Sequence, residues 1–172
     1  CRFLANGRLD PAMSEGKKFR IGIDLGGTKI EAAAIGASGD IAARQRIASP
    51  RNDYQATIQA VRELVESIEQ EIEARGSVGV AIPGAISPAT GLVKNANSTW
   101  LIGHALDVDL ASALGRPVRL ANDANCFALS EAIDGAGTGA SVVFGVIIGT
   151  GTGGGLAING QVIDGANAIA GE

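Results

Sequence analysis

Near the start of the chain, apolar and polar residues alternate with the two-residue period that is typical of β-strands. The alternation runs through 19–25, 30–36 and 41–49, and short turns at 26–29 and 37–40 interrupt it. Because short glycine-containing turns join neighbouring antiparallel strands, this pattern predicts three consecutive antiparallel strands.

A longer segment then changes to the three-and-four spacing of an amphipathic helix. Its apolar residues run from Ile58 to Ile72, with Asn52 or Asp53 as the expected cap and Gly76 as the expected end. Shorter apolar runs predict a strand, a helix, a strand and a helix, in that order, at 78–82, 107–114, 118–121 and 124–133. The resulting order βββαβαβα is typical of the ribonuclease H-like α/β fold.

The opening pattern returns after a glycine-rich break. When Gly22 is aligned with Gly145, both segments show a strand, a turn of small residues and a second strand. The second copy also reaches a turn, at 159–160, and stops at Glu172 before a whole lobe is complete. We therefore expect a two-lobed protein, of which this chain holds the first lobe and the first hairpin of the second.

Three parts are expected along the chain. Met13 resembles a natural start, and the residues before it lack the apolar core of a signal peptide. The parts are a tag or upstream segment, an N-terminal ribonuclease H-like lobe, and the start of a truncated C-terminal lobe, at 1–12, 13–135 and 136–172.

Composition and charge narrow the class of protein. The 172 residues are 46% hydrophobic and 19% charged, which is typical of a folded globular chain, and the net charge is −4. The basic residues form no continuous stripe, so neither nucleic acid nor a membrane is an expected partner. The longest strand-like apolar run, 142–148, is far shorter than the roughly 20 residues that cross a bilayer. The two cysteines, Cys1 and Cys126, suit a reducing compartment, so we expect a cytoplasmic protein.

The turn between the first two predicted strands has the chemistry of a phosphate site. Gly26 and Gly27 allow the backbone to come close to a ligand, and Thr28 adds a hydroxyl donor. Asp24 lies at the end of the first strand, where its carboxylate could hold a hydrated Mg²⁺. Lys29 follows in an order that differs from a Walker loop, which needs Gly-Lys-Ser/Thr before a helix. A tight hairpin with a surface lysine is the alternative.

A second glycine-rich turn joins the two strands of the repeated pattern. It contains the spacing GxGxxG, which by itself is a weak signal, and a strand follows it rather than the helix of a dinucleotide-binding fold. Two phosphate-type turns in repeated lobes fit a nucleotide held between the lobes. The residues of this turn expected to contact it are Gly149, Thr150, Gly151, Thr152, Gly153 and Gly154. A flexible glycine linker is the alternative.

Asn122 and Asp123 lie where a predicted strand ends and a helix begins, the edge at which open α/β sheets place their ligands. A helix N-terminus favours a charged carboxylate. Asp123 is therefore a candidate general base, which would accept the proton of a substrate hydroxyl as that hydroxyl attacks a γ-phosphate. A simple capping role for Asp123 is the alternative.

Three other residues give weaker signals. His104, the single histidine, has no cysteine or carboxylate at metal-ligand spacing and is interpreted as a loop residue. Cys126 is interpreted as a small buried apolar group. Trp100 could pack its loop or line a sugar pocket, with equal weight.

Four segments in the right order resemble a known family. They are DLGGTK at 24–29, IPGAISPATGLVKNANSTWL at 82–101, LANDAN at 120–125 and IIGTGTGGG at 147–155. With these segments, the chain resembles the ROK family of bacterial sugar kinases, and the fructokinase/mannokinase branch most closely. The family also includes transcriptional repressors with an N-terminal helix-turn-helix, and the residues before the first strand are fewer than that module needs.

The resemblance implies an actin-like ATPase fold of two ribonuclease H-like lobes, with ATP and Mg²⁺ in the cleft between them. It also implies Asp123 as the general base. The residues that it places near the sugar are Gly84, Asn97, Asn122, Asp123 and Glu172. A cysteine-rich zinc motif would follow beyond Glu172, so zinc is expected only in that missing part.

We therefore expect an ATP-dependent kinase of the 6-hydroxyl of a hexose, most of all fructose. A glucose or N-acetylglucosamine kinase and a non-catalytic sugar-binding regulator are the alternatives. The expected partners are a hexose and ATP, and a homodimer is an open alternative for the full-length protein. The fragment itself is expected to be inactive, because the inferred nucleotide site lies between two lobes.

Overall fold

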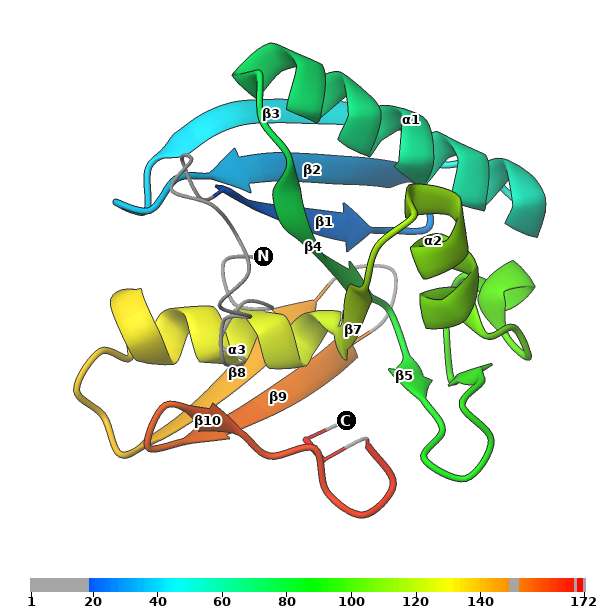
Figure 1. Cartoon of the computed structure of the whole chain (residues 1–172). Coiled ribbons are helices and arrows are strands. Elements are labelled where there is room, and N and C mark those ends of the chain that lie inside the picture. Colours follow the sequence, from blue (N-terminus) through cyan, green and yellow to red (C-terminus); the bar gives the residue numbers. More distant parts are fainter. Residues whose placement is uncertain (1–18, 149–151, 169, 172) are drawn as a thin grey trace.

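The computed structural model describes residues 19–148, 152–168 and 170–171. In these residues it shows three α-helices and three β-sheets, of five, three and two strands (Figure 1). Most of the five-stranded sheet lies in the upper half of the view beneath the first helix, and the three-stranded sheet lies in the lower half with the last helix.

The central sheet has the strand order β3-β2-β1-β4-β7. Its first three strands, β1 (Phe19–Leu25), β2 (Lys29–Ile35) and β3 (Ile41–Ala48), are antiparallel neighbours, as the alternating pattern predicted. The strands β4 (Gly76–Ile82) and β7 (Val118–Asn122) extend the sheet in parallel with β1. Three antiparallel strands followed by two parallel ones are the ribonuclease H-like arrangement, so the expected fold class is confirmed.

Helices α1 (Tyr54–Ile72) and α2 (Leu106–Leu114) pack against this sheet and against each other. The core between helices and sheet is aliphatic. Its largest fully buried side chains are Ile21, Ile23, Leu25, Ile30, Ile68, Ile82, Leu101, Leu106, Leu110, Val61, Val65 and Val80. Each such side chain contributes roughly 1.5–3 kcal/mol on leaving water, so this core is the main source of stabilisation.

The two ends of α1 show which residues stop and start the helix. Asp53 is the N-cap, and its Oδ1 accepts a hydrogen bond from the backbone N of Ala56 at 2.9 Å. At the other end Glu73 caps the helix in the left-handed conformation, with φ 52°. Gly76, which was expected to end the helix, instead begins β4.

The segment between β4 and α2 has more structure than the loop predicted from the sequence. The strands β5 (Ala85–Ile86) and β6 (Val93–Lys94) form a small hairpin, and a 3₁₀ turn follows at Thr99–Leu101. The backbone N of Val93 donates to the carbonyl oxygen of His104 at 3.0 Å, which folds the segment back on itself. Strands of two residues are too short to show a period, so the pattern did not predict them.

Helix α3 (Asp123–Asp134) packs mainly on the second sheet. That sheet consists of β8 (Val142–Ile148), β9 (Thr152–Ile158) and β10 (Gln161–Val162), in the order β10-β9-β8. The boundary expected between residues 135 and 136 stays a prediction, but the helix before it contacts chiefly the strands after it.

Two glycines bring α3 against this sheet. A Cβ on Gly155 would lie 2.2 Å from the carbonyl oxygen of Ala124, and one on Gly145 would lie 2.9 Å from the ring of Phe127. Glycine therefore lets the helix lie directly on the strands.

The exposed large apolar residues of β8 are Val142, Phe144, Val146 and Ile148. In the part of the chain described, no helix is long and apolar enough to cross a membrane.

Candidate active site

A pocket of about 680 Å³ opens at the carboxyl ends of β1, β4 and β7. Its walls come from the turn after β1, the loops after β3, β4 and β6, the first residue of α3, Ile147 of β8 and the first residues of β9. The predicted site residues that line it are Asp24, Gly26, Gly27, Thr28, Lys29, Gly84, Asn97, Asp123, Thr152 and Gly153. The fold therefore brings together four motifs that are far apart in the sequence.

The turn between β1 and β2 needs glycine for steric reasons. The backbone N of Gly26 donates to the carbonyl oxygen of Lys29 at 3.0 Å, and a Cβ on Gly26 would lie 2.9 Å from that oxygen. A Cβ on Gly27 would lie 3.2 Å from the hydroxyl of Ser98. This hydroxyl is buried and makes no hydrogen bond within the described residues. A hydroxyl without a partner beside a tight glycine turn fits a site that donates to phosphate oxygens.

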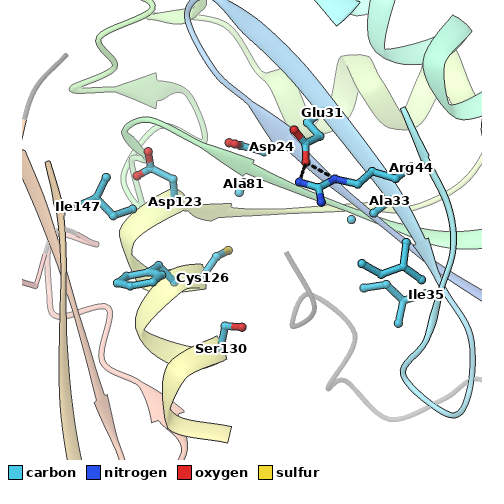
Figure 2. Close-up of a pocket in the computed structure, with 13 residues that line it drawn as sticks. Asp24, Glu31, Ala33, Ile35, Arg44, Ala81, Asp123, Cys126, Ser130 and Ile147 are labelled. Atoms are coloured by element: carbon cyan, nitrogen blue, oxygen red, sulfur yellow. Dashed lines mark hydrogen bonds and ion pairs between the residues drawn. The ribbon is translucent and has the colours of Figure 1, made fainter. Parts of the chain in front are cut away.

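Two carboxylates, those of Asp24 and Asp123, face the same space from β1 and α3 (Figure 2). Solvent reaches Asp24, but the pocket walls remove part of its hydration, and this burial raises the pKa of its carboxyl. The charge of Glu31 raises this pKa further, whereas that of Lys29 lowers it. A cation beside Asp24 would relieve this electrostatic cost, and a carboxylate oxygen is a ligand that suits Mg²⁺.

Asn122 rather than Asp123 organises the start of α3. The Oδ1 of Asn122 accepts from the backbone N of Asn125 at 3.0 Å, and its Nδ2 donates to the carbonyl oxygen of Gly84 at 3.1 Å. The structure therefore assigns the capping role to Asn122, and Asp123 is the first helical residue. The carboxylate of Asp123 accepts from the backbone N of Ala124 at 2.8 Å and lines the pocket.

Gly84 lies where the loop after β4 meets the segment after β6. Its φ is +121°, and a Cβ there would lie 2.7 Å from the carbonyl oxygen of Lys94 and 2.9 Å from the Cα of Ala96. Glycine is the residue that tolerates both this backbone conformation and this spacing. The close approach sets the position of the segment that adds Asn97 to the pocket wall.

Trp100 packs its loop, and it also lies on the wall of the pocket; a contact with sugar stays a prediction. It lines the pocket, and its Nε1 donates to the Oγ1 of Thr57 on α1 at 3.1 Å. Thr57 in turn donates to the carbonyl oxygen of Asp53 at 2.7 Å, so the indole ties the loop after β6 to the start of α1. Nearby, His104 lies in a loop as expected and stacks on Tyr54, with ring centroids 3.7 Å apart.

The remaining predicted site residues fall into two groups, those outside the described residues and those that make other contacts. Four of them lie outside the described residues, as does the segment 1–12; these four are Gly149, Thr150, Gly151 and Glu172. Gly154 is described, but a Cβ there would lie 2.3 Å from the carbonyl oxygen of Gly171 and 2.8 Å from the ring of Phe144. This glycine therefore serves packing of the second sheet.

The pocket also contains residues for which the sequence predicted no contact with a ligand. They are Arg51, Asn52, Pro83, Asn95, Thr99 and Ile147. Asn52 and Asn95 both have positive φ, at 57° and 54°, a conformation that asparagine adopts more readily than most residues. Nothing in the local sequence indicates that these loops meet in space.

A second pocket, of about 670 Å³, shares both carboxylates with the first and continues along α3 (Figure 2). On its wall Glu31 pairs with Arg44 and Arg46. Burial alone would raise the pKa of Glu31, but hydrogen bonds from the two arginines hold it below its usual value. Burial raises the pKa of the Cys126 thiol to about 11, in keeping with its predicted apolar role. Within the described residues, no three His, Cys, Asp or Glu side chains converge on a metal position.

Comparison with known proteins identifies relatives among sugar kinases. A profile described as "ROK family" matches residues 20–172. The chain is 43% identical over 151 residues to an N-acetyl-D-glucosamine kinase of Pectobacterium atrosepticum, and 44% identical over 151 residues to the N-acetylgalactosamine kinase AgaK of Shewanella sp.. These alignments cover 88% of this chain and 50% and 49% of the relatives. The chain thus spans about half the length of the curated relatives it matches.

Solved structures of ROK family sugar kinases also resemble this chain. A ROK family glucokinase from Streptomyces griseus in complex with glucose and AMPPNP has a TM-score of 0.77 at 27% identity, covering 90% of this chain and 49% of that one. A ROK hexokinase from Thermus thermophilus has a TM-score of 0.74 at 30% identity, covering 90% and 51%. The preference for the fructokinase/mannokinase branch is not supported, since the curated relatives above have the names of N-acetylhexosamine kinases. Because the family profile matches nearly all of the described residues, the chain belongs to the ROK family.

Proposed function

We propose that this chain is the N-terminal part of a kinase that transfers the terminal phosphoryl group of ATP to the 6-hydroxyl of an N-acetylated hexosamine, with N-acetylglucosamine as the first candidate. The observation that carries the proposal is one pocket that holds Asp123, the glycine turn after β1 and the loop with Asn97. The names of the two curated relatives favour an N-acetylhexosamine over fructose. Glucose is the second candidate, because the Streptomyces griseus structure contains it.

The glycine turn after β1 supplies the phosphate-binding part of the proposed site. Gly27 and Thr28 line the pocket and offer a backbone N–H group and a hydroxyl as donors, and Lys29 adds a positive charge. Asp24 would hold Mg²⁺ together with the phosphates of ATP, since Mg²⁺ in such sites takes one or two carboxylates and completes its coordination with phosphate and water. When bound, the ion neutralises charge on the phosphates.

Asp123 is the proposed general base. It would accept the proton of the sugar hydroxyl while the hydroxyl oxygen attacks the terminal phosphorus and ADP leaves. Asn122 holds this carboxylate in place by capping α3 and by binding the carbonyl oxygen of Gly84. The sugar would lie between Asp123 and the loop with Asn97, with the indole of Trp100 as an apolar wall.

Both sheets contribute to the pocket, which supports a nucleotide site between two lobes. Thr152, Gly153 and Ile147 reach it from the second sheet, and the remaining lining residues come from the first sheet, its loops and α3. We infer that residues 13–135 and 136–172 belong to the two lobes, and that Thr152 and Gly153 approach the nucleotide from the second of them.

The direct test is a coupled assay of ADP release with the full-length protein that contains this chain. N-acetylglucosamine, N-acetylgalactosamine, glucose and fructose are compared, and the phosphorylated position is determined by NMR. We expect the highest kcat/KM for N-acetylglucosamine and phosphorylation at the 6-hydroxyl. A higher value for fructose or glucose would overturn the substrate assignment. Sugar binding without ADP release would overturn the kinase assignment and favour a sugar-binding regulator.

A further inference from the structure

The pocket at the carboxyl ends of the strands balances two carboxylates against two cations. Asp24 and Asp123 line it together with Lys29 and Arg51. Arg51 is exposed to the pocket and takes no part in the ion pairs of the described residues. The arginines in those ion pairs are Arg44, Arg46, Arg62 and Arg116. A guanidinium that lines a concave site without a carboxylate partner is available to an anionic ligand.

The turn that holds Arg51 is anchored directly to the glycine turn after β1. The backbone N of Ser49 donates to the carbonyl oxygen of Thr28 at 3.1 Å. On the other side of Arg51, Asn52 adopts the left-handed conformation, with φ 57°, and Asp53 caps α1. The backbone on both sides of Arg51 is thus fixed by the hydrogen bond of Ser49 and by the cap of α1. The Arg51 side chain therefore starts from a defined position beside the proposed phosphate site.

We propose that Arg51 binds the terminal phosphoryl group of the nucleotide and neutralises the charge on its oxygens during transfer. This inference rests on the proposed function. In the transfer, the bond from the terminal phosphorus to the ADP oxygen breaks, a bond to the sugar oxygen forms, and the sugar proton goes to Asp123. Arg51 neither gives nor takes a proton in this step.

Physical chemistry favours arginine for this task. The transition state of phosphoryl transfer spreads negative charge over three oxygens, and carboxylates on the same pocket walls oppose that charge. The planar guanidinium can donate two parallel hydrogen bonds to a phosphoryl group, whereas lysine acts as a point charge. Arg51 therefore complements Lys29, and the two cations offset Asp24 and Asp123.

The test compares Arg51→Met and Arg51→Lys with the wild-type full-length protein. Arg119→Met is the matched control, because Arg119 is exposed on β7 and lines neither described pocket. Dissociation constants for ATP, ADP and AMP are measured by calorimetry, and kcat is measured with the best sugar. We expect Arg51→Met to weaken ATP binding roughly 10- to 100-fold and to leave AMP and ADP binding unchanged. Arg51→Lys should recover part of the loss.

Each outcome bears on the proposal. Equal weakening of ATP, ADP and AMP would show that Arg51 only supports the fold of the pocket, and an unchanged affinity for ATP would also overturn the proposal. A wild-type protein that binds ATP but phosphorylates no sugar would defeat the proposed function alone. In that case, a selective loss of ATP affinity in Arg51→Met would still support the contact between Arg51 and the terminal phosphate. Thermal unfolding of each variant checks that the fold is intact.

Discussion

Replacing Gly84 with alanine should disrupt the wall of the pocket for two separable reasons. Its φ is +121°, and the added Cβ would lie 2.7 Å from the carbonyl oxygen of Lys94 and 2.9 Å from the Cα of Ala96. A side chain in a sparsely populated backbone conformation costs about 1–3 kcal/mol. A methyl group forced into packed atoms costs about 1–3 kcal/mol more. Gly84→Ala should therefore lower the free energy of unfolding by about 2–6 kcal/mol, a large part of the 5–15 kcal/mol typical of proteins.

Gly91 provides a matched control within the same hairpin region. Its φ is +71°, but nothing lies within 4 Å of a Cβ built there. Gly91→Ala should therefore cost the backbone term alone, about 1–2 kcal/mol. The difference between the two variants then measures the steric cost of the close approach between the loop after β4 and the segment after β6, together with any difference between the two backbone conformations.

Urea unfolding followed by far-UV circular dichroism gives the two midpoints, and the kinase assay gives the KM for sugar and for ATP. Gly84→Ala should raise the KM for sugar more than that for ATP, because Gly84 adjoins the segment with Asn97 and not the phosphate turn. Gly91→Ala should leave both KM values near those of the wild type. If Gly84→Ala unfolds at the same urea concentration as Gly91→Ala, the steric reasoning is refuted.

Three further perturbations test the site. Asp123→Asn should lower kcat by roughly 10² to 10⁴ while sugar affinity changes only a few fold, and a variant that keeps more than about a tenth of the wild-type kcat would contradict the role of general base. Asp24→Asn should weaken ATP binding yet stabilise the unliganded protein at pH 7, because burial raises the pKa of Asp24 and its charged form therefore costs stability above that pKa. This gain, measured by thermal unfolding, should shrink as pH falls through the raised pKa toward 3.8, and a constant gain would contradict the electrostatic cause. Cys126, whose pKa burial raises to about 11, should be alkylated at pH 8 far more slowly in the folded than in the urea-unfolded protein, as peptide mass spectrometry can measure; equal rates would contradict its burial.

Short-range periodicity explains why most strands and helices could be predicted. The alternation in β1 to β3 and the three-and-four spacing in α1 each depend on residues a few positions apart, and both elements formed where expected. Errors arose where a single residue or a very short element decides the structure. Glu73 ends α1 before Gly76 does, and the strands of the β5–β6 hairpin have two residues each.

The cap of α3 is another feature that local residue types could not resolve. Asparagine and aspartate have nearly equal preference for the capping position, so the pair Asn122-Asp123 allowed either residue to cap. The hydrogen bond from Asn122 to the carbonyl oxygen of Gly84, 38 positions earlier, links the cap to the loop after β4. This long-range contact left Asp123 to face the pocket.

Local residue order was thus sufficient for the chemistry of the candidate site: a tight glycine turn, carboxylates at strand ends and a helix start. The tertiary structure determined which of these groups lie in one pocket. It also placed Arg51 on the pocket wall and formed the hydrogen bond between Trp100 and Thr57. The physical reason is that the hydrophobic period of a segment and the capping of a helix depend on residues that are neighbours in the chain. The walls of a pocket depend on the order of strands in the sheet, where β1 lies next to β4 and β4 next to β7 although long segments of chain separate them.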